Sequence, residues 1–239
     1  MMIRKVLTTV LCLFVFVSAG AAFAEESAPL EGLITKTGDG YFIMNDVTLG
    51  EMQVNLDAAI TVYEGSAAKE SLAVGQYVYV QYNGVITRTS PPQVTTDKVS
   101  CFQVTGTVTA ILDTGFTVEN DPILGTVFVH MGEGLPPVYK GVPITLYYNG
   151  VMALSYPPQL TAVYLAVPTL EGLVSGLSED GFTLTLDDGT SYRVALTTDT
   201  DILALPADGE QLLVYYSGET GAAVAALAVA SPEGEGTEL

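Results

Sequence analysis

The chain has 239 residues, a formal net charge of −19 and apolar residues at 49% of its positions, which is ample for hydrophobic cores. A surface this acidic repels phosphate backbones and forgoes the counterion release that supplies most nucleic acid affinity, so the charge excludes nucleic acid as a partner. Solubility explains the charge, and attraction of cations or basic partners stays open as the alternative.

Residues 1–24 have the pattern of a signal peptide. Arg4 and Lys5 precede an uncharged apolar run, and Ala22-Phe23-Ala24 forms a small-x-small cleavage site. An uncleaved anchor is disfavoured, because the apolar run is shorter than the ~20 residues of a membrane span. The sequence therefore predicts a protein that is secreted or held on the exterior of the cell envelope, without a stable membrane span. Cleavage would leave 6 basic against 27 acidic residues, a charge of −21.

Removal of the signal peptide would leave Cys101 as the remaining cysteine, so no intramolecular disulfide is expected. Cys101 alternates with apolar neighbours, a pattern that favours a core position over a reactive thiol. The fold must then be held by its hydrophobic cores.

One motif divides the chain into repeats. Tyr82-Asn83-Gly84-Val85 continues to Pro91-Pro92-Gln93, and the same residues recur 66 positions later as Tyr148-Asn149-Gly150-Val151 and Pro157-Pro158-Gln159. A third copy, Tyr216-Ser217-Gly218, lacks the Pro-Pro-Gln segment. The predicted units are therefore repeat 1 (25–103), repeat 2 (104–168), the divergent repeat 3 (169–230) and a disordered acidic tail (231–239).

Each unit opens with a predicted β-hairpin around a glycine-containing turn and continues with three further short strands. In repeat 1 the expected strands are 31–34, 41–44, 52–56, 76–82 and 94–102; in repeat 2 they are 105–108, 116–118, 126–130, 144–148 and 160–167; in repeat 3 they are 171–174, 182–184, 191–196, 212–216 and 224–230. Irregular linkers join the third and fourth strands at 64–75, 132–141 and 197–209, where 67–72 alone favours a turn or two of helix.

Five short strands with a connector between the third and fourth are typical of the OB-fold. The sequence thus predicts an all-β protein of three tandem small five-stranded OB-like β-barrel repeats. The alternative is a trefoil-like or solenoid-like body in which the three repeats share one β core. Short junctions at 101–105 and Pro168 favour a stiff row of barrels over beads on flexible linkers.

The sequence contains few residues that are candidates for catalysis. His130 is the single histidine and ends a strand, so a partly buried structural histidine is the favoured interpretation. Acidic pairs are frequent, and the tightest of them define a speculative calcium site in repeat 3: Asp187, Asp188, Asp199 and Asp201. Hairpin geometry alone explains Asp187-Asp188-Gly189, so no cofactor is expected and calcium remains the alternative.

The repeated motif supplies the candidate ligand-binding residues: Tyr82, Tyr148, Tyr216, Pro92 and Pro158. A tyrosine packed under a turn is the structural interpretation, and an exposed aromatic platform for sugar or peptide is the functional one. The proline pairs are first read as stiff extended entries into the fifth strand.

With its leader, its repeated Tyr-Asn-Gly and its Pro-Pro-Gln-x-Thr segment, the chain resembles small exported proteins of Gram-positive anaerobes that are built from tandem OB-like repeats of unassigned function. The resemblance implies a secreted β-protein and transfers no active site.

The leading hypothesis is a secreted or envelope-associated non-enzymatic protein that binds or spaces an extracellular glycan, peptide or envelope protein. Two alternatives remain, a carboxylate-based extracellular hydrolase and a calcium-dependent binding module centred on repeat 3. Self-association is a further alternative, because an unpaired strand edge can pair with a second molecule.

Overall fold

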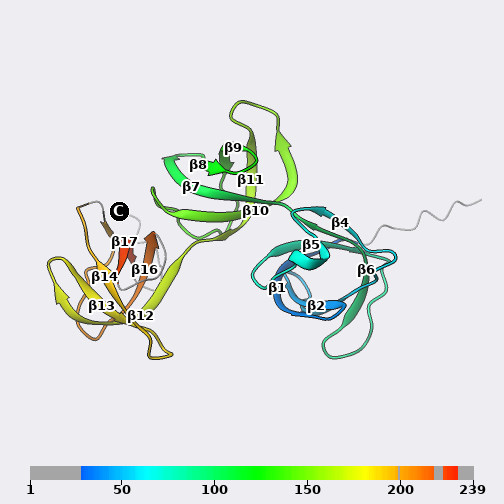
Figure 1. The fold of residues 1–239 in the computed structure, drawn as a ribbon, viewed down its shortest axis with the longest axis horizontal. Coiled ribbons are helices and arrows are strands. Elements are labelled where there is room, and N and C mark those ends of the chain that lie inside the picture. The colour runs from blue at the N-terminus through cyan, green and yellow to red at the C-terminus, as the bar shows by residue number, and fades with distance from the viewer. Residues whose placement is uncertain (1–27, 199, 218–222, 231–239) are drawn as a thin grey trace, which may run out of the picture.

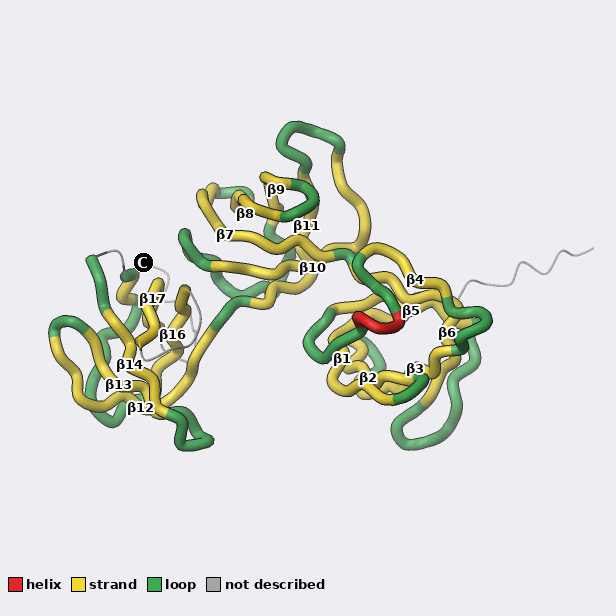
Figure 2. Tube along the Cα trace, in the orientation of Figure 1, coloured by secondary structure: helices red, strands yellow, loops and turns green. Residues whose placement is uncertain are grey.

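The structure is a computed structural model that describes residues 28–198, 200–217 and 223–230. These residues form strands β1 to β17 and one short helical turn, arranged as three β-barrels in a row (Figure 1). Figure 2 shows strands and loops throughout, with the 3₁₀ turn η1 (Lys69–Ser71) in barrel 1. No helix in the described part of the chain is long and apolar enough to cross a membrane. The predicted signal peptide and acidic tail lie outside the described residues.

Barrel 1 is a sheet with the strand order β3-β2-β1-β5-β6-β4, and β3 closes it by pairing in parallel with β6. Its strands are β1 (Leu30–Gly38), β2 (Tyr41–Asp46), β3 (Gly50–Leu56), β4 (Val62–Gly65), β5 (Tyr77–Tyr82) and β6 (Gln93–Cys101).

Barrel 2 is closed in the order β10-β11-β9-β8-β7, again with a parallel pair between β9 and β11. Its strands are β7 (Gln103–Leu112), β8 (Gly115–Asp121), β9 (Gly125–His130), β10 (Pro143–Ala153) and β11 (Gln159–Ala166).

Barrel 3 repeats the order of barrel 1 as β14-β13-β12-β16-β17-β15, with β14 and β17 in parallel. Its strands are β12 (Thr169–Ser178), β13 (Gly181–Thr185), β14 (Ser191–Ala195), β15 (Asp201–Ile202), β16 (Gln211–Ser217) and β17 (Ala223–Ala230).

The predicted fold class is confirmed, since the chain is all-β and consists of three tandem OB-like barrels. Each barrel has its own hydrophobic core, and the cores contain Phe42, Phe116 and Phe182 at equivalent places in the second strand. The alternative of one core shared by three repeats is not what the structure shows. The linkers hold more structure than expected, because β4 and β15 pair in parallel with β6 and β17.

Glycine at the start of each barrel lets the first strand cross close to the second. A Cβ atom at Gly32, Gly106 or Gly172 would lie 2.0, 2.2 or 2.4 Å from a backbone carbonyl oxygen of the facing strand. No side chain fits at these distances without a backbone shift. The repeated glycine is therefore a packing requirement of the barrel.

A buried aspartate ties the first strand to the turn after the second in barrels 1 and 2. Each carboxylate accepts three backbone N–H groups at 2.7–2.9 Å: Asp46 from Glu31, Thr48 and Leu49, and Asp121 from Thr105, Ile123 and Leu124. Both side chains are less than 10% exposed, at 5% and 8%. Barrel 3 has Leu186 at the matching place and a tight Asp-Asp-Gly turn instead.

The joint between barrels 1 and 2 is a cluster of tyrosines. Tyr147 belongs to β10 of barrel 2, yet its side chain packs into the core of barrel 1 and is 5% exposed. The rings of Tyr77 and Tyr164 stack with their centroids 5.7 Å apart and 15° between their planes, and Tyr147 lies 6.5 Å and 6.0 Å from them. Barrels 1 and 2 therefore share buried apolar surface and do not hang on a flexible linker.

The joint between barrels 2 and 3 uses the same position. Tyr215 of β16 matches Tyr147, is also 5% exposed and lies 4.8 Å from the ring of Tyr139 in barrel 2. In barrel 1 the matching residue is Gln81, which is exposed and has no preceding barrel in the described chain. The face that docks on a preceding barrel is thus aromatic in barrels 2 and 3, and the same face is polar in barrel 1, the first barrel of the described residues.

These joints predict a sensitivity to alkali. Burial raises the pKa of Tyr77, Tyr139 and Tyr147 to about 12, because a buried phenolate is poorly solvated. The unfolded chain ionises at its ordinary pKa of 10.0, so the stability from neutral tyrosines is full below pH 10 and is lost as the pH rises through about 12.

A tyrosinate absorbance titration followed in parallel by circular dichroism checks this prediction. We expect Tyr77, Tyr139 and Tyr147 to ionise together with loss of structure. Ionisation of these three tyrosines near pH 10 in a folded chain would contradict it. Tyr147→Phe, which retains the ring, serves as the control that removes one ionising group from the joint.

Candidate functional site

The repeated motif forms a projecting hairpin in barrels 1 and 2, here called the arm: residues 83–92 in barrel 1 and 149–158 in barrel 2. At its base the side-chain oxygen of Asn83 or Asn149 accepts the N–H of the valine two residues on, at 3.0 Å. The glycine between them has a φ of 81° or 83°, which a non-glycine residue rarely adopts. The Asn-Gly pair therefore sets the turn that starts the arm.

The proline pair lies at the C-terminal end of the arm, where its second proline is hydrogen-bonded to the third strand of the barrel, β3 or β9. The carbonyl of Pro92 accepts the N–H of Gln53 at 2.9 Å, and that of Pro158 accepts the N–H of Phe128 at 2.9 Å. Both prolines are partly buried. The prolines therefore lie directly before the fifth predicted strand of each repeat, which is β6 in barrel 1 and β11 in barrel 2.

The glutamine that follows the prolines joins a row of polar side chains on the outer face of the barrel. In barrel 1, Gln53 donates to Asn55 at 2.8 Å, and Asn55 donates to Gln93 at 3.3 Å. In barrel 2, His130 Nε2 lies 3.1 Å from Gln159 Oε1, and its ring meets Phe128 edge to face at 4.9 Å. The glutamine amide thus has a hydrogen-bonding partner from the third strand in both barrels.

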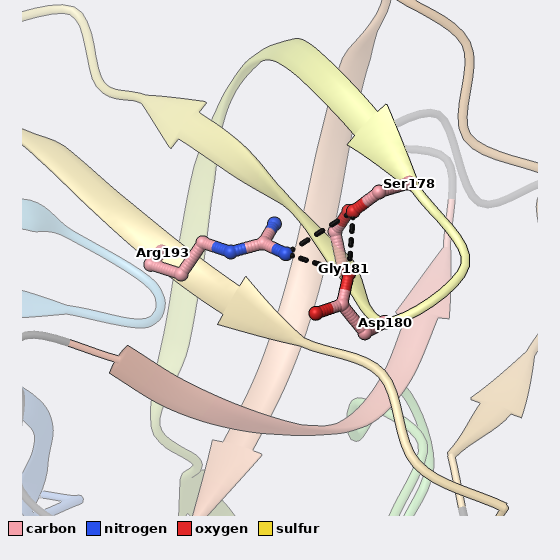
Figure 3. Close-up of polar contacts among 4 residues, drawn as sticks. All are labelled: Ser178, Asp180, Gly181 and Arg193. Carbon is pink, nitrogen blue, oxygen red and sulfur yellow. Dashed lines mark hydrogen bonds and ion pairs between the residues drawn. The ribbon is translucent and has the colours of Figure 1, made fainter.

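Barrel 3 has lost this arrangement. The strand register places Arg193 and Ala195 where barrel 1 has Gln53 and Asn55. Figure 3 shows that Arg193 turns to the β12–β13 hairpin, where its Nη2 lies 3.1 Å from both Ser178 Oγ and Asp180 Oδ1. The hydrogen bond from Ser178, a backbone hydrogen bond and the Arg193 charge hold the pKa of Asp180 below its ordinary value. This contact is exposed and stabilises the β12–β13 hairpin. It does not form a candidate ligand-binding site.

A groove lies beside the arm of barrel 2, with a volume of about 260 Å³. The polar row forms one part of its lining and the base of the arm forms the other: His130, Asn149, Val151, Ala153, Gln159, Leu160 and Thr161. The lining combines amide, imidazole and hydroxyl groups with small apolar side chains and holds no carboxylate, ammonium or guanidinium. We call it the arm groove and take it as the candidate site.

The arm of barrel 2 exposes apolar side chains, both in the lining of the groove and outside it. Val151 is 70% exposed, Leu154 96%, and Tyr156 has no protein covering it, at 102%. The arm lies within the stretch from Gly141 to Leu170, 30 residues without a charged side chain in a chain with 35 of them. Large exposed apolar groups on an uncharged hairpin are typical of contact with a ligand or partner.

A larger hollow, about 610 Å³, lies on the outer face of β7 and β10. Its lining includes Thr107, Pro143 and Thr145, and the strand registers match Pro143 and Thr145 to Tyr77 and Tyr79 of barrel 1. The hollow thus arises where small residues replace the large tyrosines of the neighbouring joint. It offers few polar side chains that would orient a ligand, so the smaller arm groove is the better candidate.

The predicted tyrosines lie in strands β5, β10 and β16 and pack inward. Tyr82, Tyr148 and Tyr216 are all partly buried and pack against the cores of barrels 1, 2 and 3, respectively. Tyr148 also meets Phe102 at 5.7 Å between ring centroids, and burial followed by the charge of Asp121 raises its pKa. The exposed aromatic residue near the motif is instead Tyr156. It is not part of the repeated motif, because barrel 1 has Ser90 at the matching position.

The other singled-out side chains are structural in their surroundings. Cys101 is buried in the core of barrel 1, and burial raises the pKa of its thiol to about 11. His130, expected to be a partly buried strand-end residue, does end β9 and is half-buried, but it also lines the arm groove.

The predicted calcium residues do not form a cluster in the described part of the chain, where no group of three potential ligands meets. Asp187 and Asp188 lie exposed in a turn, and Asp201 is exposed in β15. The N–H of Thr190 donates to Asp188 at 2.8 Å and lowers the pKa of that carboxyl. Asp199 lies outside the described residues.

Calcium is therefore expected to leave the melting temperature unchanged. A ligand that binds the folded state alone must raise that temperature, by mass action. Differential scanning calorimetry of the chain in millimolar calcium and in a chelator checks this. A rise in melting temperature that disappears in Asp187→Asn and Asp201→Asn variants would restore the calcium module.

No protein-family model matches the chain, and no curated protein matches it. The solved structures that match the chain include two at low sequence identity and low TM-score. One is Drosophila Unr CSD456, at 11% identity and a TM-score of 0.20, over 80% of this chain and 91% of that chain. The other is a multidomain protein with nucleic acid binding domains from Streptococcus pneumoniae, at 15% identity and a TM-score of 0.21, over 88% of this chain and 75% of that chain. Likeness at this level carries no argument about the fold or the ligand of this chain.

The exclusion of nucleic acid as a partner is wrong. One of the similar structures is described as having nucleic acid binding domains. The net charge of a whole chain does not decide the question, because single strands also bind through bases stacked on exposed aromatic rings. Nucleic acid therefore belongs among the ligands that a binding experiment on this protein must include.

Proposed function

We propose that this chain is a non-enzymatic binding protein that acts outside the cell or on its envelope and holds its ligand in the arm groove of barrel 2. The observation that carries the proposal is the groove itself. Neutral hydrogen-bonding side chains line a concave surface at the foot of an uncharged arm whose apolar tip is exposed. Such a mixture of apolar surface and a few placed polar groups is the usual composition of a ligand site.

The groove chemistry favours binding over catalysis. General acid–base hydrolysis by carboxylates needs two of them facing the substrate, and His130 is the only titratable side chain in the lining. The carboxylates with lowered pKa values lie outside the groove: Glu64 bonds Lys98 and Ser100 in barrel 1, and Asp180 and Asp188 lie in exposed turns of barrel 3. The leader sequence supports export, and the tyrosine joints support a stiff row in which barrels 1 and 3 space the binding barrel from its surroundings.

Retention experiments with residues 25–239 test the proposal. The chain is offered insoluble bacterial cell wall, immobilised polysaccharides, single-stranded oligonucleotides and peptides. We expect retention on at least one of these, and its loss in Gln159→Ala, which removes the amide that lines the groove. Gln93→Ala changes the matching residue in barrel 1 and is the control, with retention unchanged.

Two results would overturn the proposal. One is no retention on any of the matrices by a chain whose circular dichroism shows a folded β-protein. The other is retention that Gln159→Ala and Gln93→Ala leave equally intact, because the ligand would then lie elsewhere.

A further inference from the structure

The hydrogen-bonding groups of the arm groove match hydroxyl groups. With Gln159 Oε1 accepting from His130 Nε2, the amide NH₂ of Gln159 is left to donate. Asn149 Oδ1 takes the N–H of Val151, which likewise leaves its NH₂, and the exposed Thr161 hydroxyl both donates and accepts. Closely spaced neutral donors and acceptors suit a ligand with several hydroxyls on one ring.

The absence of charge narrows the ligand further. No residue that lines the groove is acidic, and none is Lys or Arg. A charged group brought into a groove without a counter-charge loses hydration without compensation. An uncharged ligand suffers no such loss.

The tip of the arm adds a flat apolar surface. Tyr156 is fully exposed, and the loop that carries it is held by the Ser155 hydroxyl, which donates to the Pro157 carbonyl at 2.7 Å, and by the bond from Phe128 to Pro158. An aromatic side chain has few rotatable bonds, so on a loop held in this way it offers a large contact area at little cost in conformational entropy. The apolar C–H face of a sugar ring complements such a surface.

We infer, resting on the proposed function, that the ligand of the arm groove is a neutral oligosaccharide. One sugar unit lies in the groove, with its hydroxyls bonded by Asn149, Gln159 and Thr161, and a further unit lies on the ring of Tyr156. The volume of about 260 Å³ is below the ~300 Å³ at which pockets for drug-sized molecules begin. A single ring therefore fits the groove, and the rest of the chain extends along the arm.

Barrel 1 supplies an internal comparison. Its arm has Arg88 and Ser90 where barrel 2 has Leu154 and Tyr156, and both are exposed. It therefore lacks the aromatic platform and carries a cation. Neutral sugars are expected to bind barrel 2 and not barrel 1.

Calorimetric titration of residues 25–239 tests the inference with four named probes: hexamers of β-1,4-linked glucose, β-1,4-linked N-acetylglucosamine and β-1,4-linked mannose, and a single-stranded deoxythymidine oligonucleotide. At least one sugar is expected to bind. Tyr156→Ala is expected to weaken that sugar about tenfold, in keeping with the loss of one aromatic contact. Tyr156→Phe keeps the ring and is expected to bind within about twofold of the parent. Ser90→Ala, the matched change in barrel 1, is the control for unaltered binding, and thermal melts confirm that every variant folds.

The outcomes separate the two proposals. Sugar binding weakened in both Tyr156→Ala and Gln159→Ala supports the inference. Binding of the oligonucleotide but of no sugar, abolished by Gln159→Ala, overturns the oligosaccharide and leaves the arm groove as the binding site. Sugar binding that Tyr156→Ala does not weaken also overturns the inference. Binding of any probe that Gln159→Ala leaves intact overturns the proposed function together with the inference.

Discussion

Replacing Tyr147 by alanine is expected to lower the free energy of unfolding of the paired barrels 1 and 2 by about 3–5 kcal/mol, the range for truncating a large buried aromatic side chain. The side chain is 5% exposed and leaves its own barrel to pack in the core of barrel 1. Its loss removes contacts with both Tyr77 and Tyr164 and opens a cavity between the barrels. The effect should therefore appear as a loss of cooperativity between barrels as well as a loss of stability.

Urea denaturation followed by circular dichroism measures this effect. Barrels 1 and 2 are expected to unfold in one transition in the parent chain and in two separate transitions in Tyr147→Ala. Gln81→Ala is the matched control, because Gln81 occupies the same strand position in barrel 1 but is exposed. Its effect is expected to stay within about 0.5 kcal/mol, as for most surface substitutions. Equal denaturation curves for the two variants would show that the joint contributes nothing to stability.

The strands were predictable because their signals are local. The alternation in Tyr77–Tyr82 and the glycine turns before Phe42 and Phe182 act over a few residues, and the structure has strands at those places. The alanine-rich segment at the end of repeat 3 also forms a strand, β17, because pairing with β16 outweighs the weak propensity of alanine. The short strands β4 and β15 were missed, since each is held by a parallel partner far away in sequence.

The joints follow from a comparison between repeats and not from periodicity. Alternation shows which residues of a strand face outward, but it does not show whether another barrel covers them. The joint is indicated by a change at one repeat position, where repeat 1 has Gln81 and the later repeats have Tyr147 and Tyr215. An outward residue that becomes aromatic in the later repeats marks a face that docks on the repeat before it.

The tyrosines of the repeated motif show the opposite case, in which a residue recurs because the fold requires it. Tyr82, Tyr148 and Tyr216 recur in every repeat because each packs on the core below its turn. Tyr156, by contrast, has Ser90 as its counterpart in barrel 1 and is fully exposed on the arm of barrel 2. The proposed binding surface combines both kinds of residue, because Asn149 and Gln159 recur in barrel 1 and Tyr156 does not. Repetition of the tyrosines therefore reflects the fold, and the departure at Tyr156 marks the surface that distinguishes the arm of barrel 2.

Asp46 and Asp121 were missed although a repeated signal was present. Both stand in the segment Asn-Asp-x-x-Leu-Gly, at 45–50 and again at 120–125. Turn chemistry alone accounts for an aspartate in such a segment, so the pattern does not single it out. The structure shows that the carboxylate also reaches the first strand, which no local pattern reveals.

The second large effect is expected from Asp121→Ala, which should destabilise barrel 2 by about 2–4 kcal/mol, since hydrogen bonds to charged groups and unsatisfied buried donors each cost about 1–3 kcal/mol. The substitution strips the acceptor from the N–H groups of Thr105, Ile123 and Leu124 at once. Asp46→Ala is expected to do the same to barrel 1, whereas barrel 3 has no such carboxylate among its described residues.

Differential scanning calorimetry of Asp121→Ala and Asp121→Asn measures the effect and its origin. Asparagine retains an oxygen for the two turn N–H groups but presents an NH₂ to the N–H of Thr105, so its loss of stability is expected to be smaller than that of alanine and still above 1 kcal/mol, the cost of about one buried donor. Asp113→Ala, an exposed turn aspartate of the same barrel, is the control with an unchanged melting temperature. If Asp121→Ala melts with the control, the carboxylate does not hold the first strand to the turn. If alanine and asparagine are equally damaging, the bond to Thr105 carries the whole effect, and the tie between β7 and the turn after β8 is the interaction that barrel 2 needs.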